Sequence, residues 1–383
     1  MPKVLDFHGV QTRFIERLDT PIAMLNPSIV GVVGWGEGAD DKEFPLDTPV
    51  LVNSRAQIAK MGKGSLAQAH NEMWGQTSLV TVVVRVAHDA DKNKLKANLI
   101  GKLDNDTGKM TGMKALYRAE NDAGVDPKII ICPNINHLSI AKDVGLELEK
   151  FSKRGAMPIV EVAGQGLADW KNFASSFSDA YLIAGGVKYF DAVKEKDVVT
   201  GGSAVAAAIM VRTDNEKGFQ HSPSNHKAYG IKSNGASIDY SPASKTTLSH
   251  LLNESSINCF VSKQGGCYLW GNRIADGKFV QHVRTNQTIA NSINTGIQAF
   301  TDRNITVRFM DDFKQKIRNT LRLLKMNEVI TGGEVEIEHD KNKVAVGTGK
   351  FYARYDLGLF DCAENIILTY EINKEYTREI YKD

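Results

Sequence analysis

The sequence predicts an α/β fold followed by a smaller α+β unit, and three observations support this fold class. Continuous β-branched runs such as SLVTVVVRV (78–86) and PKIIICPN (127–134) alternate with helical stretches, which is typical of a mixed or largely parallel sheet. After Pro242 the pattern changes to two amphipathic helices and then short strand-like runs broken by turns. Both chain ends alternate in hydrophobicity with a period of two, as strands do.

The first part of the chain supplies the predicted mixed sheet. We expect strands at 29–33, 50–52, 78–86, 127–134, 156–162 and 179–190, and helices at 54–76, with Ser54 as the N-cap, and at 203–214. Residues 89–112 are rich in Lys, Asn and Asp and have little apolar periodicity. We therefore expect an exposed insertion there, within an outer α/β domain that covers 21–245.

The second part contains two apolar stripes at helical spacing. One consists of Ile289, Ile293, Ile297 and Phe300, and the other of Phe313, Ile317, Leu321 and Leu324. Strand-like runs separated by Gly and Asn turns follow at 332–359. These elements predict a smaller inner α+β domain at 246–362.

The two termini are predicted to be strand-forming arms, 1–20 and 363–383. The apolar positions of their alternating patterns are Leu5, Phe7, Val10 and Phe14 at the start, and Ile366, Leu368, Tyr370 and Ile372 at the end. Two interpretations remain open. Each arm forms an edge strand of its own subunit, or it adds to a sheet edge of another subunit through backbone hydrogen bonds. Head-to-tail contacts of the second kind that do not close on themselves generate helical filaments.

Charge and composition exclude several functional classes. The chain has 383 residues and a formal net charge of +2, so we expect no bulk attraction to nucleic acid or to anionic membranes. No apolar run approaches the roughly 18–20 residues that cross a bilayer, and the N-terminal segment lacks the apolar region of a signal peptide. The four cysteines have neither metal-site nor disulfide-framework spacing. We expect reduced thiols and synthesis in the cytoplasm.

The motifs that favour an enzyme are weak. GVVGWGEG (31–38) follows a strand, but an acidic, proline-containing stretch comes next instead of the helix that a nucleotide loop requires. GTGK (347–350) lacks the hydroxyl residue that would hold magnesium. Ser222 and Ser224 have no nucleophile elbow around them, and no histidines have metal spacing. We expect no catalytic, cofactor or metal site; an α/β enzyme that binds a small ligand at 31–38 remains the alternative.

One charged stripe stands out in the second part of the chain. Four basic residues follow one helical face beside the second apolar stripe: Lys314, Arg318, Arg322 and Lys325. The stripe is either a solvated helix face or a surface that docks on an acidic partner.

Three stretches resemble the signature of contractile tail sheath proteins, which form the outer tube of contractile phage tails and of phage-tail-like bacteriocins. They are SPSNHKAYGI (222–231), LLNESSINCFVSKQGGCYLWGNR (251–273) and HVRTNQTIANSI (282–293). PSIVGVVGWGEG (27–38) and TGMKALYRAE (111–120) are similar to the N-terminal half of the same family. The resemblance covers nearly the whole chain and is most specific at YLWGNR.

The resemblance implies a structural subunit, not an enzyme, with no cofactor. Its copies would polymerise as helical, hexameric rings around a tail tube and contract by rigid-body rearrangement to drive the tube through a target envelope. Partners would be copies of the chain, the tail tube protein, the baseplate and the tail terminator, in a virion tail or tail-like particle made in a bacterial host. A non-contractile tube or adaptor protein is a further alternative.

The resemblance also implies roles for particular segments. In this family both arms cross to neighbouring subunits and complete the sheets of their inner domains, and these arms match 1–20 and 363–383. The basic stripe is the candidate for a helix that docks on the tube.

The signature residues themselves have an expected structural role. Tyr268 and Trp270 are expected to end a core strand of the inner domain, where Gly271 allows a close turn. In that turn Asn272 can bond its own backbone, and Arg273 offers a planar fork to a carboxylate or carbonyl.

Overall fold

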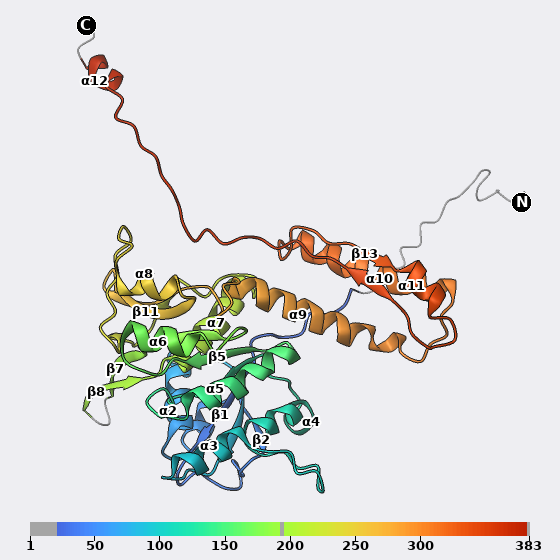
Figure 1. Ribbon diagram of the computed structural model, residues 1–383, viewed down its shortest axis with the longest axis horizontal. Coiled ribbons are helices and arrows are strands. Elements are labelled where there is room, and N and C mark those ends of the chain that lie inside the picture. The colour runs from blue at the N-terminus through green and yellow to red at the C-terminus, as the bar shows by residue number, and fades with distance from the viewer. Residues whose placement is uncertain (1–20, 192–194, 381–383) are drawn as a thin grey trace, which may run out of the picture.

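The computed structural model describes residues 21–191 and 195–380, and its main body is a nine-stranded mixed sheet with helices on both faces (Figure 1). The strands of this sheet are β1 (Val30–Trp35), β2 (Pro49–Val52), β3 (Thr81–Val86), β4 (Ile129–Ile131), β5 (Met157–Glu161), β6 (Tyr181–Ala184), β9 (Lys227–Ala228), β11 (Ile257–Lys263) and β12 (Gly266–Trp270). Their order is β2-β3-β1-β4-β5-β6-β11-β12-β9. The pairs from β3 to β11 are parallel, and the antiparallel pairs lie at the two margins.

Helices cover both faces of this sheet, so its central strands are buried on both sides. The helical elements of the main body are α1 (Arg55–Ile58), α2 (Ser65–Trp74), α3 (Lys92–Ile100), η1 (Gly112–Arg118), α4 (Ala119–Ala123), α5 (Ala141–Glu149), η2 (Lys150–Arg154), α6 (Gly166–Ala174), α7 (Ser203–Lys217) and α8 (Leu248–Asn253). α2 and α7 pack on one face, and α3, α5, α6 and α8 on the other. This double burial explains the continuous β-branched runs of the sequence and confirms the mixed α/β prediction.

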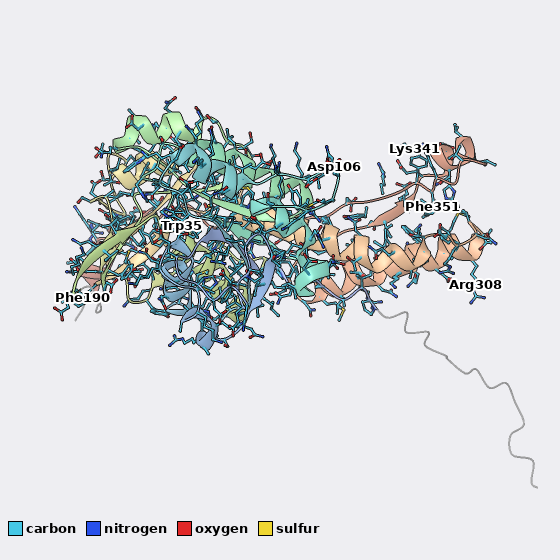
Figure 2. The ribbon with its side chains drawn as sticks, turned by 90° about the horizontal axis from the view of Figure 1, so that it is seen from below. Trp35, Asp106, Phe190, Arg308, Lys341 and Phe351 are labelled. Atoms are coloured by element: carbon cyan, nitrogen blue, oxygen red, sulfur yellow. The ribbon has the colours of Figure 1, made fainter. Side chains whose placement is uncertain are left out.

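A small side sheet projects from the main body. It consists of β10 (Ser233–Asn234), β7 (Val187–Asp191) and β8 (Lys196–Thr200), in that order. Figure 2 shows Phe190 of β7 at one end of the molecule, with Arg308 and Lys341 at the other. β7 and β8 form an antiparallel hairpin. The single strand predicted at 179–190 is therefore two strands, because β6 belongs to the main sheet and β7 to the side sheet.

A second hydrophobic core lies beyond the main body, and a long helix connects the two (Figure 1). This helix is α9 (Val280–Ile297); η3 (Gln298–Phe300), α10 (Val307–Met326), β13 (Val335–Ile337), α11 (His339–Val344) and β14 (Ala353–Tyr355) follow it. Val280 belongs to a main-body core, whereas Ile289 and Ile293 belong to the second core. Both predicted apolar stripes line this second core, which confirms their helical interpretation.

The second core also takes up the first residues that the structure describes. The side chain of Ile22 is buried there, and its backbone N–H donates to Thr320 Oγ1 of α10 at 3.0 Å. The N–H of Leu25 donates to Ser292 Oγ of α9 at 2.9 Å. A Cβ at Gly296 would lie 2.4 Å from the Ile22 side chain, so glycine permits this close approach. The start of the described chain is therefore fixed to α9 and α10.

The packing of the chain does not follow the predicted division at residue 245. β11 lies parallel beside β6, with Ile257 opposite Leu182, so residues 257–270 belong to the main sheet and not to a separate domain 246–362. Conversely, Ile22 of the predicted domain 21–245 packs in the second core. The packing divides within α9, whose first residue Val280 lies in a main-body core while Ile289 and Ile293 lie in the second core.

Three local predictions also need correction. Residues 89–112 are not a single exposed insertion, because α3 buries Leu95 and Leu99 in the main body; the projecting part is the loop near Asp106 (Figure 2), closed by a bridge between Leu103 and Met110. The helical pattern at 54–76 is two helices, α1 and α2. Residues 339–344 form α11, although they were expected to lie among strands and turns.

A buried ion pair holds the two cores together. Arg284 of α9 donates from both terminal nitrogens to the Asp214 carboxylate of α7, at 2.7 and 2.6 Å, and each side chain is 3% exposed. Ser28 Oγ donates to the same carboxylate at 2.8 Å, and Arg284 also donates to the Pro27 carbonyl at 3.3 Å. The pair thus joins the N-terminal segment, the buried helix α7 and the connecting helix α9.

Removal of one partner from this pair is expected to be costly. In Arg284→Met the Asp214 carboxylate stays buried without its cation, and we expect the free energy of unfolding to fall by about 3–5 kcal/mol. Urea unfolding followed by tryptophan fluorescence measures this loss. The double variant Asp214→Leu/Arg284→Met should recover most of it. Arg354→Met, at the exposed pair with Glu336, is the control and should cost at most about 1 kcal/mol; an equal loss in both single variants would contradict the assignment.

Candidate functional site

The C-terminal segment is an extended arm that leaves the body of the molecule (Figure 1). Residues 361–373 have no helix or strand, and the short helix α12 (Glu375–Glu379) follows. Apolar side chains of both parities are 73–87% exposed: Ile366, Ile367, Leu368, Tyr370 and Ile372. The arm therefore forms no edge strand of its own subunit, and α12 is an element that the strand prediction missed. The apolar residues predicted for the N-terminal arm, Leu5, Phe7, Val10 and Phe14, lie outside the described residues.

The first residues of the C-terminal arm are clamped to the main body by Arg273. Its Nε and Nη2 donate to the carboxylate of Glu364 at 2.6–3.2 Å, and its Nη1 donates to the Gly277 carbonyl. The guanidinium also lies 4.3 Å from the ring centroid of Phe279. Hydrogen bonding to Glu364 raises the pKa of Arg273 above its ordinary value. The planar fork predicted for Arg273 thus meets a carboxylate, and that carboxylate belongs to the arm.

His282 provides a second contact at the same place. Its Nε2 lies 2.9 Å from the Phe360 carbonyl and 3.7 Å from the Asp361 carboxylate. The ring packs edge-to-face on Phe279, with centroids 5.2 Å apart. Together, His282 and Arg273 hold residues 360–364 against α9 and the turn after β12. The free part of the arm therefore begins at residue 365.

The signature residues before Arg273 build the strand end that positions it. Trp270, the last residue of β12, packs edge-to-face on Tyr240 with centroids 4.9 Å apart. The Lys263 ammonium lies 4.3 Å from the Trp270 ring centroid and 5.0 Å from that of Tyr268, and burial lowers the pKa of Lys263. Cation–π contacts of this kind contribute about 0.5–2 kcal/mol each. Trp270 is the last residue of β12 and Tyr268 lies two positions before it, and this strand belongs to the nine-stranded sheet.

The turn after Trp270 is held by side chains from other elements. Gly271 has a φ of +118°, and a Cβ there would lie 2.3 Å from Asn258 Oδ1. Asn258 Nδ2 donates to the Arg273 carbonyl at 2.9 Å, and Tyr181 OH donates to the Gly271 carbonyl at 2.7 Å. Asn272 is buried, and its carbonyl accepts from the N–H of Val280 at 2.8 Å. Glycine is thus required at 271, and a hydrogen bond links this turn to Val280, the first residue of α9.

A two-stranded sheet in the second core has open edges. β13 pairs with β14 in an antiparallel register, with Val335 opposite Tyr355 and Ile337 opposite Ala353. Val335 and Ile337 are buried in the second core, whose apolar face is supplied by α10. Within 21–191 and 195–380, no further strand pairs with either strand. A sheet of two strands is only marginally stable. Strands added to the unpaired edges of β13 and β14 would stabilise it.

The predicted basic stripe lies on α10 beside the buried apolar stripe, about 100° round the helix from it. Arg318, Arg322 and Lys325 are exposed and Lys314 is half-buried, whereas the apolar stripe of the same helix is buried. Among the described residues none of the four forms a salt bridge. Their charges are therefore available to solvent or to an acidic partner.

The glycine-rich segment at 31–38 serves packing. Gly31 and Gly34 lie within β1, where a Cβ would come 2.8 Å from the Ile130 side chain and 2.4 Å from Ser65 Oγ, respectively. At Gly36 a Cβ would come within 2.0 Å of the Met61 carbonyl oxygen. These glycines permit close contact of β1 with its neighbours, which argues against a ligand loop at this position.

In the described parts of the chain, no helix is long and apolar enough to cross a bilayer.

The chain is similar in sequence to tail sheath proteins of a phage and of a prophage. The chain is 28% identical to the tail sheath protein of Escherichia phage P2 over 384 residues, which is 96% of each protein. It is 26% identical to a putative prophage major tail sheath protein of Pseudomonas aeruginosa over 387 residues, 98% of each. No protein-family model matches the chain.

Solved structures with the same fold are sheath and baseplate assemblies. The PVC sheath complex of an extracellular contractile injection system, in its contracted state, aligns with a TM-score of 0.67 at 14% identity, covering 97% of this chain and 99% of that one. The baseplate of the anti-feeding prophage in its contracted state aligns with a TM-score of 0.72 at 17% identity, with the same coverage. These similarities agree with the family resemblance read from the sequence.

The clamp at the start of the arm gives a testable expectation. Glu364→Gln removes the charge that Arg273 binds, and we expect faster proteolysis and hydrogen exchange at residues 360–364. The free energy of unfolding should change by no more than about 1 kcal/mol, because both side chains are more than one third exposed. Hydrogen-exchange mass spectrometry measures the effect. Glu375→Gln, beyond the clamp, is the matched control; identical exchange in the two variants would count against the clamp.

Proposed function

We propose that this homologue of phage tail sheath proteins is the structural subunit of a contractile tail sheath, and that its copies assemble helically through their arms. The observation that carries the proposal is the C-terminal arm, which is apolar, extended and clamped at its first residues while its strand-forming part is free. The sheath names of the relatives and the sheath fold of the structural neighbours support it. No chemistry is needed for this role, so the subunit acts as a structural protein and not as an enzyme.

The acceptor for the arm is the β13–β14 sheet of a neighbouring copy. An arm that adds to this sheet gains backbone hydrogen bonds and buries one parity of its side chains. Burial of Ile366, Leu368, Tyr370 and Ile372 yields roughly 6–12 kcal/mol, whereas ordering the seven residues 366–372 costs roughly 7–14 kcal/mol. One arm alone therefore binds weakly, and the assembly depends on repeated contacts, including the N-terminal arm 1–20.

Contraction follows from rigid subunits on flexible links. The two cores are joined by α9 and the buried Arg284–Asp214 pair, whereas residues 365–373 have no secondary structure of their own. Subunits in hexameric rings can then rotate and slide as rigid bodies while the arms keep them connected. The extended sheath is a metastable lattice whose rearrangement drives the tail tube through the envelope of the target cell.

The partners and location follow from this role. Besides its own copies, the chain meets the tail tube protein, the baseplate and the tail terminator. The basic stripe Lys314, Arg318, Arg322 and Lys325 faces an acidic surface of the tube, because it is the exposed face of the helix that carries the second core. The chain is made in the cytoplasm of a bacterial host and becomes part of a virion tail or tail-like particle.

Deletion of residues 363–383 tests the proposal. The truncated chain should keep its helical content and cooperative unfolding, because the salt bridge that the deletion removes, Arg273–Glu364, is partly exposed and contributes at most about 1 kcal/mol. It should remain monomeric in analytical ultracentrifugation, while the full chain forms long hollow tubes in negative-stain electron microscopy. Long tubes from the truncated chain would reject the arm model. Tubes that occur in one form only, with and without a tail tube, would favour the non-contractile alternative.

Charge reversal tests the tube-facing assignment separately. Arg318→Glu/Arg322→Glu should leave self-assembly intact but abolish co-assembly with purified tail tubes, because two attractive contacts per subunit become repulsive. Co-sedimentation with tubes measures the difference. Lys341→Glu/Lys343→Glu on α11 changes the charge equally on another helix of the second core. If both double variants bind tubes like the unaltered chain, the stripe is a solvated face.

A further inference from the structure

Two buried carboxyl groups lie in the main body, away from the arm and the second core. Glu72 of α2 is 7% exposed, and Glu161, the last residue of β5, is 2% exposed. Within the described residues neither forms an ion pair with a basic side chain. Two ionised carboxylates at this buried place would repel each other and would lose their hydration. The hydrogen-bond partners of the two groups differ accordingly.

Glu161 is surrounded by hydrogen-bond donors. Its Oε1 accepts from Ser203 Oγ at 2.6 Å and from the Ser203 N–H at 3.3 Å, and its Oε2 accepts from the N–H of Ile135 at 3.1 Å. Ser203 is the first residue of the fifteen-residue helix α7, whose N-terminal dipole favours a negative charge. A Cβ at Gly201 would lie 2.0 Å from the carboxyl group, so glycine makes room for it. Burial raises the pKa of Glu161, but these donors oppose that effect.

Glu72 has no comparable support. Its Oε1 is buried and accepts no hydrogen bond, and the hydroxyl groups of Thr200 of β8 and Tyr189 of β7 beside it only partly oppose the rise of its pKa. Burial, and secondarily the charge of Glu161, raise the pKa of Glu72 from 4.5 to about 8. Burial and Glu72 also raise the pKa of Tyr189 to about 12, so this phenol stays neutral. The pKa of both carboxyl groups is raised, but Glu161 accepts three hydrogen bonds whereas Glu72 Oε1 accepts none, so Glu72 is the group that more readily carries a proton.

We propose that the two carboxyl groups hold a single proton, carried by Glu72, and that its loss in alkaline solution loosens the contact between α2 and the β7–β8 hairpin. Among the residues that the structure describes, the groups beside Glu72 and Glu161 are all acidic or neutral: Tyr189 from β7, Thr200 from β8, Ser203 from α7, and Cys132 after β4, whose thiol pKa is raised by burial. None of them can neutralise a second negative charge. The hairpin lies at the margin of the molecule, so it is the element that can move.

The direction in which stability changes with pH follows from the raised pKa of Glu72. Because the pKa of Glu72 is higher in the folded chain than in the unfolded chain, its contribution is neutral below about pH 4.5 and destabilises the fold increasingly as the pH rises to about 8. Glu72→Gln cannot ionise and should lose this dependence. Relative to the unaltered chain, its midpoint of thermal unfolding should rise by about 3–6 °C between pH 5 and pH 9. Glu161→Gln should instead be destabilised at both pH values, because the amide has a single acceptor oxygen and cannot accept from both Ser203 and the Ile135 N–H.

Thermal unfolding and infrared spectroscopy of the full chain test the proposal together. We expect the C=O stretch of a protonated carboxylic acid at pH 6, its loss near pH 8, and its absence in Glu72→Gln. Hydrogen exchange at residues 187–191 and 196–200 should be faster in the unaltered chain than in Glu72→Gln at pH 9. Exposed Glu120→Gln is the control. Lack of the infrared band at pH 6 in the unaltered chain, or the same pH dependence of unfolding in Glu72→Gln, would overturn the proposal without any variant having to assemble.

Discussion

The buried pair between Arg284 and Asp214 is the constraint on which the rest of the structure depends. It fixes the connecting helix α9 to the buried helix α7, and through Ser28 and Pro27 it also fixes the segment that leads to the second core. Gln287 and Asn291 add hydrogen bonds from α9 to the carbonyls of Ala156 and Gly155. The two cores therefore behave as one rigid body, and motion between subunits has to occur outside them.

The strengths of the two salt bridges decide where that motion occurs. A buried, doubly hydrogen-bonded pair costs several kcal/mol to break by loss of one partner, whereas a partly exposed pair such as Arg273–Glu364 contributes about 0–1 kcal/mol. The arm can thus be directed by its clamp without being locked to it. A lattice that changes its radius and pitch needs this combination of a stiff subunit and an adjustable link.

Local patterns in the sequence predicted the elements, but not the contacts between distant segments. The β-branched runs and the stripes of α9 and α10 were predicted because burial on both faces, or on one helical face, leaves a periodic trace. The packing crosses the boundary predicted at 245 because the pairing of β11 with β6 joins residues about 75 positions apart, and no local pattern in the sequence reveals this pairing. Leu95 and Leu99 are too few to make a stripe on α3, so this helix was interpreted as an insertion.

The candidate site was predicted in outline for the same reason. The alternation of the C-terminal arm and the fork of Arg273 are visible in the sequence, but Glu364 is a single acidic residue 91 positions away, without any pattern of its own. Lys263, Asn258 and His282 were missed because their contacts exist only after the sheet has formed. The pairing of Glu72 with Glu161 likewise follows from topology and not from spacing.

An arm that points away from its own β13–β14 sheet (Figure 1) gives an assembly a direction. In the arm-exchange assembly proposed above, every copy offers a donor strand at one place and an open acceptor sheet at another, so the two ends of a growing stack are chemically different. One end of such a stack presents unfilled β13–β14 sheets, and the other presents unbound C-terminal arms. A different molecule is then needed to terminate each end. The polarity of the particle is therefore already encoded in the single subunit, before any second copy is present.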